Sequence, residues 1–371
     1  MTKGIKINVH TFNTYLIIGL IIVLLLGIYT VQMNKPKAEP AKAPQKISQL
    51  TVTVITPPRC DDCFDKGAFA AAVRQLPNTN VTEAYLEYNS TEGKALIEKF
   101  TLARLPAAVI TGETENLSIP SFKQKDNVYY FDDTPPPYYN VSSKRVAGRV
   151  MITYIKDASC AQCFDITQFS SQLEGVGVSI GSERVLDATE PDAKAMIARY
   201  SITKIPTMLI SPEALQYPVI AQVWEQVGTS EADGMLVMRN ITPPYKDLAD
   251  NKVHGHVTIT YLVDKSCATC YNASMHSIVL AESFGMRFKE EKYVDISTKS
   301  GQDLVKKYGI KYVPTLLLDK EAEFYSALGE AWTDVGDQAA DGTYVFRKVD
   351  QLAGITYKDL ATNTTNSTPA Q

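Results

Sequence analysis

The longest apolar stretch of the chain lies near its beginning, where no charged residue occurs between Lys6 and Lys35. Residues 15–33 read YLIIGLIIVLLLGIYTVQM. A helix of this length, with a rise of about 1.5 Å per residue, nearly spans a bilayer, so the pattern predicts a transmembrane helix. No small-residue cleavage site follows closely, so we expect an uncleaved anchor after a short N-terminal segment, residues 1–14. The prolines, lysines and alanines of residues 34–49 predict a semi-rigid extended linker.

From residue 50 onward, one pattern of apolar and polar positions occurs three times. Each copy has an alternating β-rich run, a helix-compatible segment, a second strand, a second helix and two further strands. This order predicts an α/β fold with a parallel strand–helix–strand centre and a βαβαββ core in each copy. The predicted domains are residues 50–147, 148–253 and 254–360, and the Thr/Asn-rich residues 361–371 predict a disordered tail.

The six cysteines form three identically spaced pairs with no thiol left over: Cys60/Cys63, Cys160/Cys163 and Cys267/Cys270. The first cysteines are 100 and 107 residues apart, and periods this long indicate whole domains. Each pair follows the first strand, so we expect the first cysteine near a helix N-terminus, whose free amides would stabilise a thiolate. This arrangement suits thiol-disulfide exchange, with the first cysteine of each pair as nucleophile and the second as the resolving residue.

An aliphatic–Pro–small element follows each pair 46 or 47 residues after the first cysteine, and its prolines are Pro106, Pro206 and Pro314. Together with the cysteine pairs, these elements make residues 50–360 resemble three tandem copies of the thioredoxin-like superfamily. The resemblance implies that each proline is cis and lies beside the sulfurs in a substrate groove. It also implies a protein-disulfide oxidoreductase without a cofactor, with protein thiols and disulfides as substrates and a separate partner that recycles it.

The chain departs from the family pattern around the cysteines. The thioredoxin sequence Trp-Cys-Gly-Pro-Cys is replaced by RCDDC, SCAQC and SCATC. Thioredoxins carry a buried acid six residues before the first cysteine, and this chain has Val54, Tyr154 and Tyr261 there. We expect Cys60 to be less reactive than Cys160 and Cys267, because Asp61 and Asp62 oppose a thiolate more than Arg59 favours it.

The first repeat also differs beside its proline. Ala107 stands where the other repeats have Thr207 and Thr315. The loss of a hydroxyl there predicts a groove that binds substrate differently.

Charge and sequons bear on the partners and the compartment. The net charge is −4 without a long run of one sign, so nothing indicates nucleic acid. The cysteine pairs and long translocatable domains favour an extracytoplasmic location, against the lysine distribution around the apolar stretch. An excess of Asn-x-Ser/Thr sequons agrees with that location. These sequons begin at Asn80, Asn89, Asn116, Asn140, Asn240, Asn272, Asn363 and Asn366.

Two alternatives remain at this stage. A zinc site would need four ligands, but each cysteine pair belongs to its own repeat and supplies only two. Only His276 closely follows a cysteine pair, and the other histidines are His10, His254 and His256. A reduced pair could still bind a soft ion transiently. The other alternative is a non-catalytic binding scaffold whose disulfides are structural, with Tyr138 and Tyr139 in interdomain packing or a contact surface. Reducibility of the disulfides separates this scaffold from an oxidoreductase.

Overall fold

The computed structural model describes residues 47–115 and 117–370. The predicted N-terminal segment, the transmembrane helix at 15–33 and most of the linker lie outside the described residues. Within the described ranges, every helix is too short or too polar to cross a bilayer.

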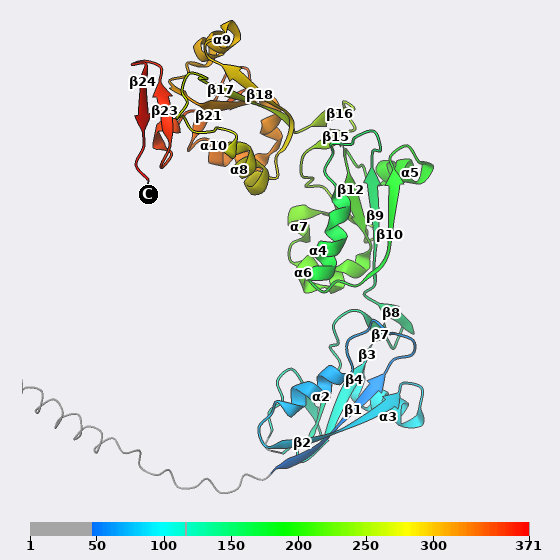
Figure 1. Cartoon of the computed structure of the whole chain (residues 1–371). Coiled ribbons are helices and arrows are strands. Elements are labelled where there is room, and N and C mark those ends of the chain that lie inside the picture. The colour runs from blue at the N-terminus through cyan, green and yellow to red at the C-terminus, as the bar shows by residue number, and fades with distance from the viewer. Residues whose placement is uncertain (1–46, 116, 371) are drawn as a thin grey trace, which may run out of the picture.

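The first repeat is built on a five-stranded mixed sheet in the order β2-β1-β4-β6-β5 (Figure 1). β1 pairs parallel with β2 and antiparallel with β4, which confirms the predicted parallel strand–helix–strand centre. The elements of this sheet and its helices are β1 (Ser48–Thr56), α2 (Gly67–Arg74), β2 (Thr79–Glu87), α3 (Thr91–Phe100), β4 (Ala107–Gly112), β5 (Lys123–Lys125) and β6 (Val128–Phe131).

The alternation of β1 places one helix on each face of the sheet. Val52 and Val54 pack against Phe69 of α2, whereas Ile55 packs against Phe100 of α3 in a second core. All five side chains are at most 4% exposed. The repeat therefore has three layers, with two hydrophobic cores separated by the sheet.

The second and third repeats have the same topology, with sheet orders β10-β9-β12-β14-β13 and β18-β17-β20-β22-β21. In the second repeat the elements are β9 (Val150–Lys156), α4 (Phe169–Gly175), β10 (Ile180–Asp187), α5 (Pro191–Arg199), β12 (Thr207–Ile210), α6 (Pro218–Ala221), α7 (Trp224–Val227), β13 (Gly228–Ser230) and β14 (Leu236–Met238). In the third they are β17 (His256–Val263), α8 (Met275–Phe284), β18 (Arg287–Asp295), α9 (Lys299–Tyr308), β20 (Thr315–Leu318), α10 (Ser326–Trp332), β21 (Gly336–Gln338) and β22 (Tyr344–Phe346). The predicted α/β class and threefold repetition are confirmed.

Each repeat also carries a small three-stranded sheet and an edge strand that the βαβαββ pattern did not contain. Strands of two to four residues are too short to show a hydrophobic period, so sequence alone does not reveal them. The small sheets are formed by β3 (Arg104–Leu105), β7 (Tyr138–Asn140) and β8 (Arg145–Ala147), by β11 (Lys204–Ile205), β15 (Tyr245–Asp247) and β16 (Lys252–His254), and by β19 (Tyr312–Val313), β23 (Thr356–Asp359) and β24 (Thr364–Ser367).

Two predictions about these segments are wrong. Residues 364–367 of the predicted disordered tail form β24, which pairs antiparallel with β23. The Thr/Asn-rich composition reflects an exposed hairpin strand, and its β-branched threonines suit that conformation. Tyr138 and Tyr139 are buried inside the first repeat: Arg104 lies over the Tyr138 ring and Tyr139 packs edge-on against Tyr88.

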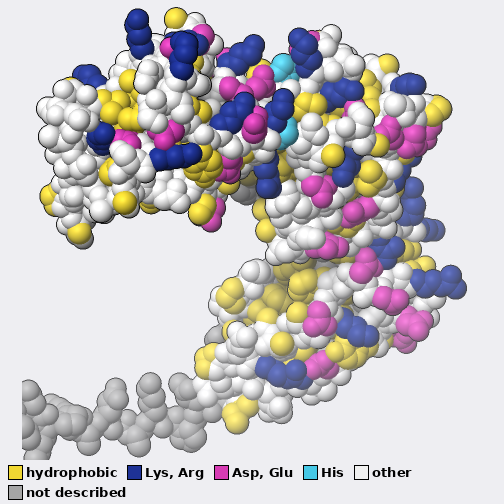
Figure 2. Space-filling model, turned by 45° about the horizontal axis from the view of Figure 1, so that its top comes forward, with side chains coloured by type: hydrophobic (Ala, Val, Ile, Leu, Met, Phe, Trp, Pro, Cys, Tyr) yellow, Lys and Arg dark blue, Asp and Glu magenta, His cyan; other side chains and the backbone are white. Residues whose placement is uncertain are grey.

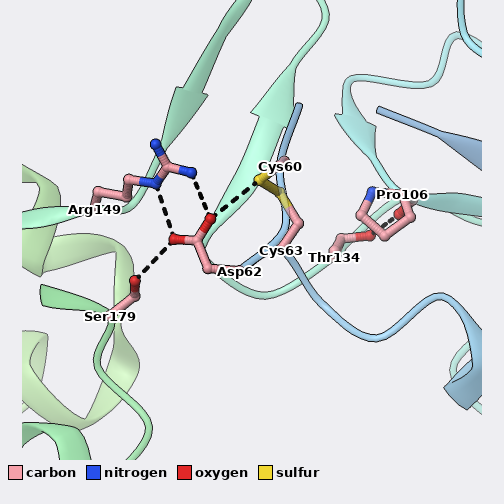
Figure 3. Close-up of a disulfide and its surroundings, with 7 residues drawn as sticks. All are labelled: Cys60, Asp62, Cys63, Pro106, Thr134, Arg149 and Ser179. Carbon is pink, nitrogen blue, oxygen red and sulfur yellow. Dashed lines mark hydrogen bonds and ion pairs between the residues drawn. A yellow bond between two sulfur atoms is a disulfide. The ribbon is translucent and has the colours of Figure 1, made fainter. Parts of the chain in front are cut away.

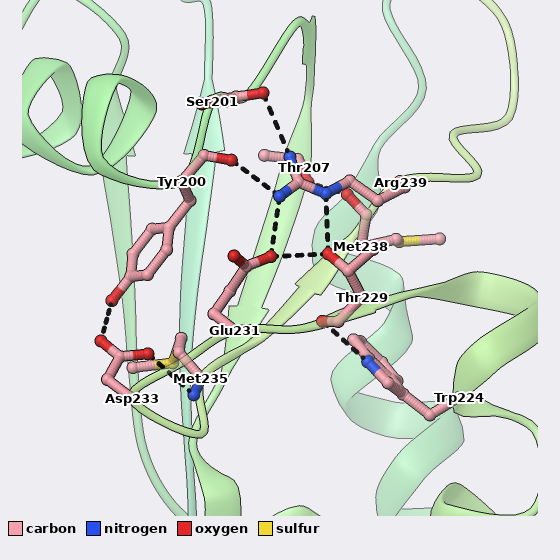
Figure 4. A network of polar contacts seen from close by, with 10 residues as sticks. All are labelled: Tyr200, Ser201, Thr207, Trp224, Thr229, Glu231, Asp233, Met235, Met238 and Arg239. Carbon is pink, nitrogen blue, oxygen red and sulfur yellow. Dashed lines mark hydrogen bonds and ion pairs between the residues drawn. The ribbon is translucent and has the colours of Figure 1, made fainter.

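The second and third repeats share an arginine that joins the end of a helix to the sheet, and Figure 4 shows the one of the second repeat. Arg239 donates to the carbonyl of Tyr200, just after α5, at 2.7 Å, and pairs with Glu231 at 2.8 Å. Arg347 similarly bonds the carbonyl of Tyr308 and pairs with Asp337. These bonds satisfy carbonyls that the helix itself leaves free.

The two junctions between repeats are built alike. The amide of Gly148 donates to Glu213 at 2.8 Å, and its carbonyl accepts the hydroxyl of Tyr217 at 2.6 Å. Gly255 makes the same two bonds, with Glu321 at 2.9 Å and Tyr325 at 2.7 Å. Figure 2 shows the first and third repeats lying apart, with the second repeat joining them.

Candidate functional site

A disulfide closes each cysteine pair a few residues beyond the first strand of its repeat. The bonds join Cys60 to Cys63, Cys160 to Cys163 and Cys267 to Cys270, with Cα–Cα distances of 5.3, 5.3 and 5.4 Å. The amide of Cys163 donates to the Cys160 carbonyl at 3.2 Å, and Cys270 repeats this bond to Cys267 at 3.4 Å. Each pair therefore lies in a turn.

The expected position at a helix N-terminus is wrong. Asp65, Asp165 and Asn272, each two residues after the second cysteine, accept the amides of Gly67, Thr167 and Ser274. These side chains set the local turn that precedes the first helix, which is what short polar residues do at such positions. The α-helices begin only at Gly67, Phe169 and Met275, the second after a short 3-10 helix at Ile166–Gln168, so each first cysteine lies well before the N-terminal amides of its α-helix.

The three prolines after the second helices have cis peptide bonds, as the resemblance implied: Leu105–Pro106, Ile205–Pro206 and Val313–Pro314. In the first repeat, Pro106 lines a cavity of about 320 Å³ together with Cys60, Cys63 and Phe64. The hydroxyl of Thr134 donates to the Pro106 carbonyl at 2.5 Å (Figure 3). In the third repeat, Tyr271, next to Cys270, donates to the Pro314 carbonyl at 3.0 Å.

The threonines that follow two of these prolines do not face a groove. Thr207 and Thr315 are fully buried and donate to the carbonyls of Met238 and Phe346, both at 2.8 Å. The missing hydroxyl at Ala107 therefore removes a bond between strands, and the expectation that it alters the substrate groove is wrong.

A lysine–aspartate pair adjoins the disulfide in the second and third repeats, and the sequence analysis did not identify it. Lys246 Nζ lies 2.5 Å from Asp157, and Lys358 Nζ lies 2.6 Å from Asp264. Each aspartate stands three residues before the first cysteine, and its carbonyl accepts that cysteine's amide at 3.0 Å. The pair therefore ties the disulfide loop to the small sheet.

The same aspartates also hold a serine of the loop. Asp157 accepts the amide and hydroxyl of Ser159 at 2.8 and 2.6 Å, and Asp264 holds Ser266 at the same distances. Hydrogen bonds from Lys246 and Ser159 lower the pKa of Asp157. Burial opposes ionisation of Asp264, but the bonds from Lys358 and Ser266 outweigh it, and its pKa is also lowered.

The sequence carried a signal for these pairs. Asp-x-Ser-Cys and Tyr-Lys-Asp-Leu occur in the second and third repeats, whereas the first repeat has Pro57 and Tyr139 in place of aspartate and lysine. Both partners change together, as expected for groups that contact each other.

The first repeat instead has a carboxylate between its cysteines, which a residue of the next repeat binds (Figure 3). Asp62 Oδ1 lies 3.7 Å from Cys60 Sγ. Arg149 donates to both carboxylate oxygens, from Nε at 2.9 Å and from Nη2 at 2.5 Å. The hydrogen bond from Arg149 lowers the pKa of Asp62. Arg149 thus offsets one of the two charges expected to suppress Cys60, a residue and an effect that sequence reasoning missed.

Three further side chains that the sequence singled out, Tyr154, Tyr261 and His276, are neutral. Tyr154 and Tyr261, at the position of the thioredoxin acid, are fully buried, and burial raises the pKa of both. His276 contacts the Tyr271 hydroxyl at 3.3 Å, and burial lowers its pKa. Among the described residues, no cluster of three or more His, Cys, Asp or Glu side chains could hold a metal ion.

The sheet order, the disulfide after the first strand and the cis-proline before the antiparallel strand are the features of a thioredoxin-like fold in each repeat. No family model and no curated protein sequence matches the chain. Among solved structures it is similar to ERdj5 form II, at 12% identity over 77% of this chain and 40% of that chain, with a TM-score of 0.15. It is also similar to human ERp44 form I, at 9% identity over 88% and 90%, with a TM-score of 0.15. Because these whole-chain superpositions are poor, the assignment rests on the geometry of each repeat.

Proposed function

We propose that this chain is a thiol-disulfide oxidoreductase that acts on protein disulfides through three CxxC pairs. The observation that carries the proposal is the recurrence, in all three repeats, of a closed disulfide in a turn after the first strand together with a cis-proline. In the first repeat the sulfurs and Pro106 line one open cavity. A groove beside a disulfide is where an extended substrate segment with its own disulfide can approach.

In the reductive direction, the thiolate of the first cysteine attacks one sulfur of a substrate disulfide. A mixed disulfide forms, and the other substrate sulfur leaves as a thiolate. The second cysteine, as a thiolate, then attacks the first cysteine's sulfur, which closes the CxxC disulfide and releases the second substrate thiolate. Two electrons pass from the pair to the substrate, and the reverse sequence oxidises a substrate dithiol. The reaction needs no cofactor, but a second redox protein has to restore the pair.

Equilibration of the full chain in glutathione buffers, followed by thiol labelling and peptide mass spectrometry, tests this proposal. We expect each pair to titrate between about −120 and −270 mV, the range of catalytic CxxC proteins. Variants in which one pair is changed to serine identify the contribution of that pair. If all three pairs stay oxidised below about −300 mV, they are structural disulfides, and the chain is the scaffold considered above.

We further propose that the chain is anchored by residues 15–33 with its three domains outside the cytoplasm. Among the described sequons, Asn80, Asn89, Asn240, Asn272 and Asn363 are exposed, and Asn140 and Asn366 are partly exposed, so all are accessible in part to a modifying enzyme. Protease added to intact cells should digest the three domains. Protection that is lost only on lysis would place them in the cytoplasm and contradict this location.

A further inference from the structure

The disulfide loop of the first repeat is bound by the second repeat. Asp62 lies between Cys60 and Cys63, and it pairs with Arg149, which directly precedes β9. Ser179, just before β10, donates its hydroxyl to the same carboxylate at 3.3 Å. Both contacts come from the second repeat, and Figure 3 shows them converging on Asp62 from its side of the junction.

Hydrogen bonds of the junction hold in place the two groups that bind Asp62. The Tyr217 hydroxyl accepts the amide of Ser179 at 3.0 Å and donates to the carbonyl of Gly148 at 2.6 Å. Gly148 is the residue before Arg149, so one tyrosine holds the backbone beside both groups that bind Asp62. A bidentate guanidinium–carboxylate pair on such a support has a defined geometry.

Asp62 also faces the sulfur. Its Oδ1, 3.7 Å from Cys60 Sγ, would repel a thiolate on Cys60 if its charge were uncompensated. The charged residues that line the cavity beside Cys60 are Arg59, Asp61, Asp65 and Lys66, two of each sign. The pairing of Asp62 with Arg149 therefore decides the balance of charge around Cys60.

We propose that Arg149 of the second repeat is a positioning residue for the Cys60–Cys63 pair, holding and neutralising Asp62 so that Cys60 can exist as a thiolate. The proposal rests on the proposed function, because it assigns Arg149 a role in the reactivity of that pair. By linkage, docking of the two repeats favours the reduced, ionised form of Cys60, and ionisation of Cys60 favours docking. This property belongs to the first junction: Gln162 and His256 occupy the equivalent positions at the second, and the described residues show no hydrogen bond between them.

The test uses the full chain reduced by a phosphine, with the alkylation rate of each cysteine followed against pH by peptide mass spectrometry. Arg149→Ala should slow alkylation of Cys60 at pH 7 about three- to tenfold, corresponding to a rise of its pKa by about half a unit to one unit. Alkylation of Cys160 and Cys267 should be unchanged. Arg184→Ala is the matched control, because Arg184 lies in the same repeat and its contacts are with Thr153, Met196 and Asp192.

The Asp62→Asn background shows whether Arg149 acts through the carboxylate. In this background, Arg149→Ala should slow alkylation of Cys60 by less than half as much as it does in the wild-type chain. The midpoint reduction potential of Cys60–Cys63 in glutathione buffers should fall only in the single variant Arg149→Ala. An alkylation rate of Cys60 within twofold of wild type in Arg149→Ala, or an equal change at Cys160, overturns the proposal. Because phosphine reduces the pairs whatever their potential, this result is independent of whether glutathione can reduce them, which tests the proposed function.

Discussion

Replacement of Lys246 by methionine is expected to destabilise the second repeat by about 3 kcal/mol at pH 7. Methionine retains much of the apolar volume of the lysine stem, so the change removes mainly the ammonium group. Asp157 has a side chain only 11% exposed, and it would keep its charge without its partner. Removal of one partner of a largely buried ion pair lowers the stability of the fold by more than the intact pair contributes, because the other charge stays buried without a partner.

The pH dependence of this loss has a definite sign. The pKa of Asp157 is lowered in the folded chain, so the stabilisation from its ionised form is present above the unfolded pKa of about 3.9 and is lost as pH falls through the folded pKa. The difference between wild type and Lys246→Met should therefore be largest near neutral pH and shrink below about pH 4.

Hydrogen exchange resolved by peptide measures this effect within one repeat of a multidomain chain, for which a single unfolding free energy is not defined. Peptides of the second repeat should exchange faster, whereas those of the third repeat, which keeps Lys358 and Asp264, serve as an internal reference. The double variant Asp157→Asn/Lys246→Met should recover part of the protection. Equal loss in the single and double variants would show that packing of the lysine stem, rather than the stranded charge, is responsible.

Replacement of Gly148 by alanine is expected to destabilise the docked form of the first junction by about 3 kcal/mol, so that the junction opens. Gly148 has φ +86°, and an added Cβ would lie 2.3 Å from Cβ of Pro136. The substitution therefore combines an unfavourable backbone conformation with an overlap against the preceding repeat. Small-angle scattering should show a larger radius of gyration, and proteases should cut the junction sooner.

Gly177 provides the matched control for this prediction. Its φ is +84°, but no other group lies within 4 Å of a Cβ built there. Gly177→Ala should cost only the backbone term, about 1 kcal/mol, and leave the scattering profile unchanged. If both alanine variants behave alike, the junction absorbs the overlap by a local shift.

Sequence predicted the parts of this molecule that are set by long periodic segments and by fixed spacing. The alternation at residues 51–55 predicted β1, the spacing of the cysteines predicted a redox pair in each repeat, and the resemblance that the cysteines and prolines carry implied the cis-prolines. It failed where a short polar side chain decides the local structure. Asp65, for example, places the start of α2 beyond the cysteine pair rather than at it.

Contacts between distant residues of the chain were harder to predict. Lys246 is 89 residues from Asp157, and Arg149 is 87 residues from Asp62. The sequences Asp-x-Ser-Cys and Tyr-Lys-Asp-Leu, shared by the second and third repeats, are a signal for the lysine–aspartate pair, whereas nothing in the sequence marks Arg149 as a partner of a disulfide loop. The pair of Arg149 and Asp62 also joins two domains, so each domain considered alone would present an unpaired charge.

The small three-stranded sheets connect each repeat to the next and allow further repeats to be added. β8 and β16, the last strands of two such sheets, lead directly into Gly148 and Gly255, and β24 occupies the same position in the third repeat. Each unit thus supplies its own trailing connector, while the glutamate and tyrosine that receive it belong to the following unit. Duplication of one whole unit would copy both the connector and the glutamate and tyrosine that bind the connector of the unit before it. A longer array of repeats would then use the same contacts at each new junction.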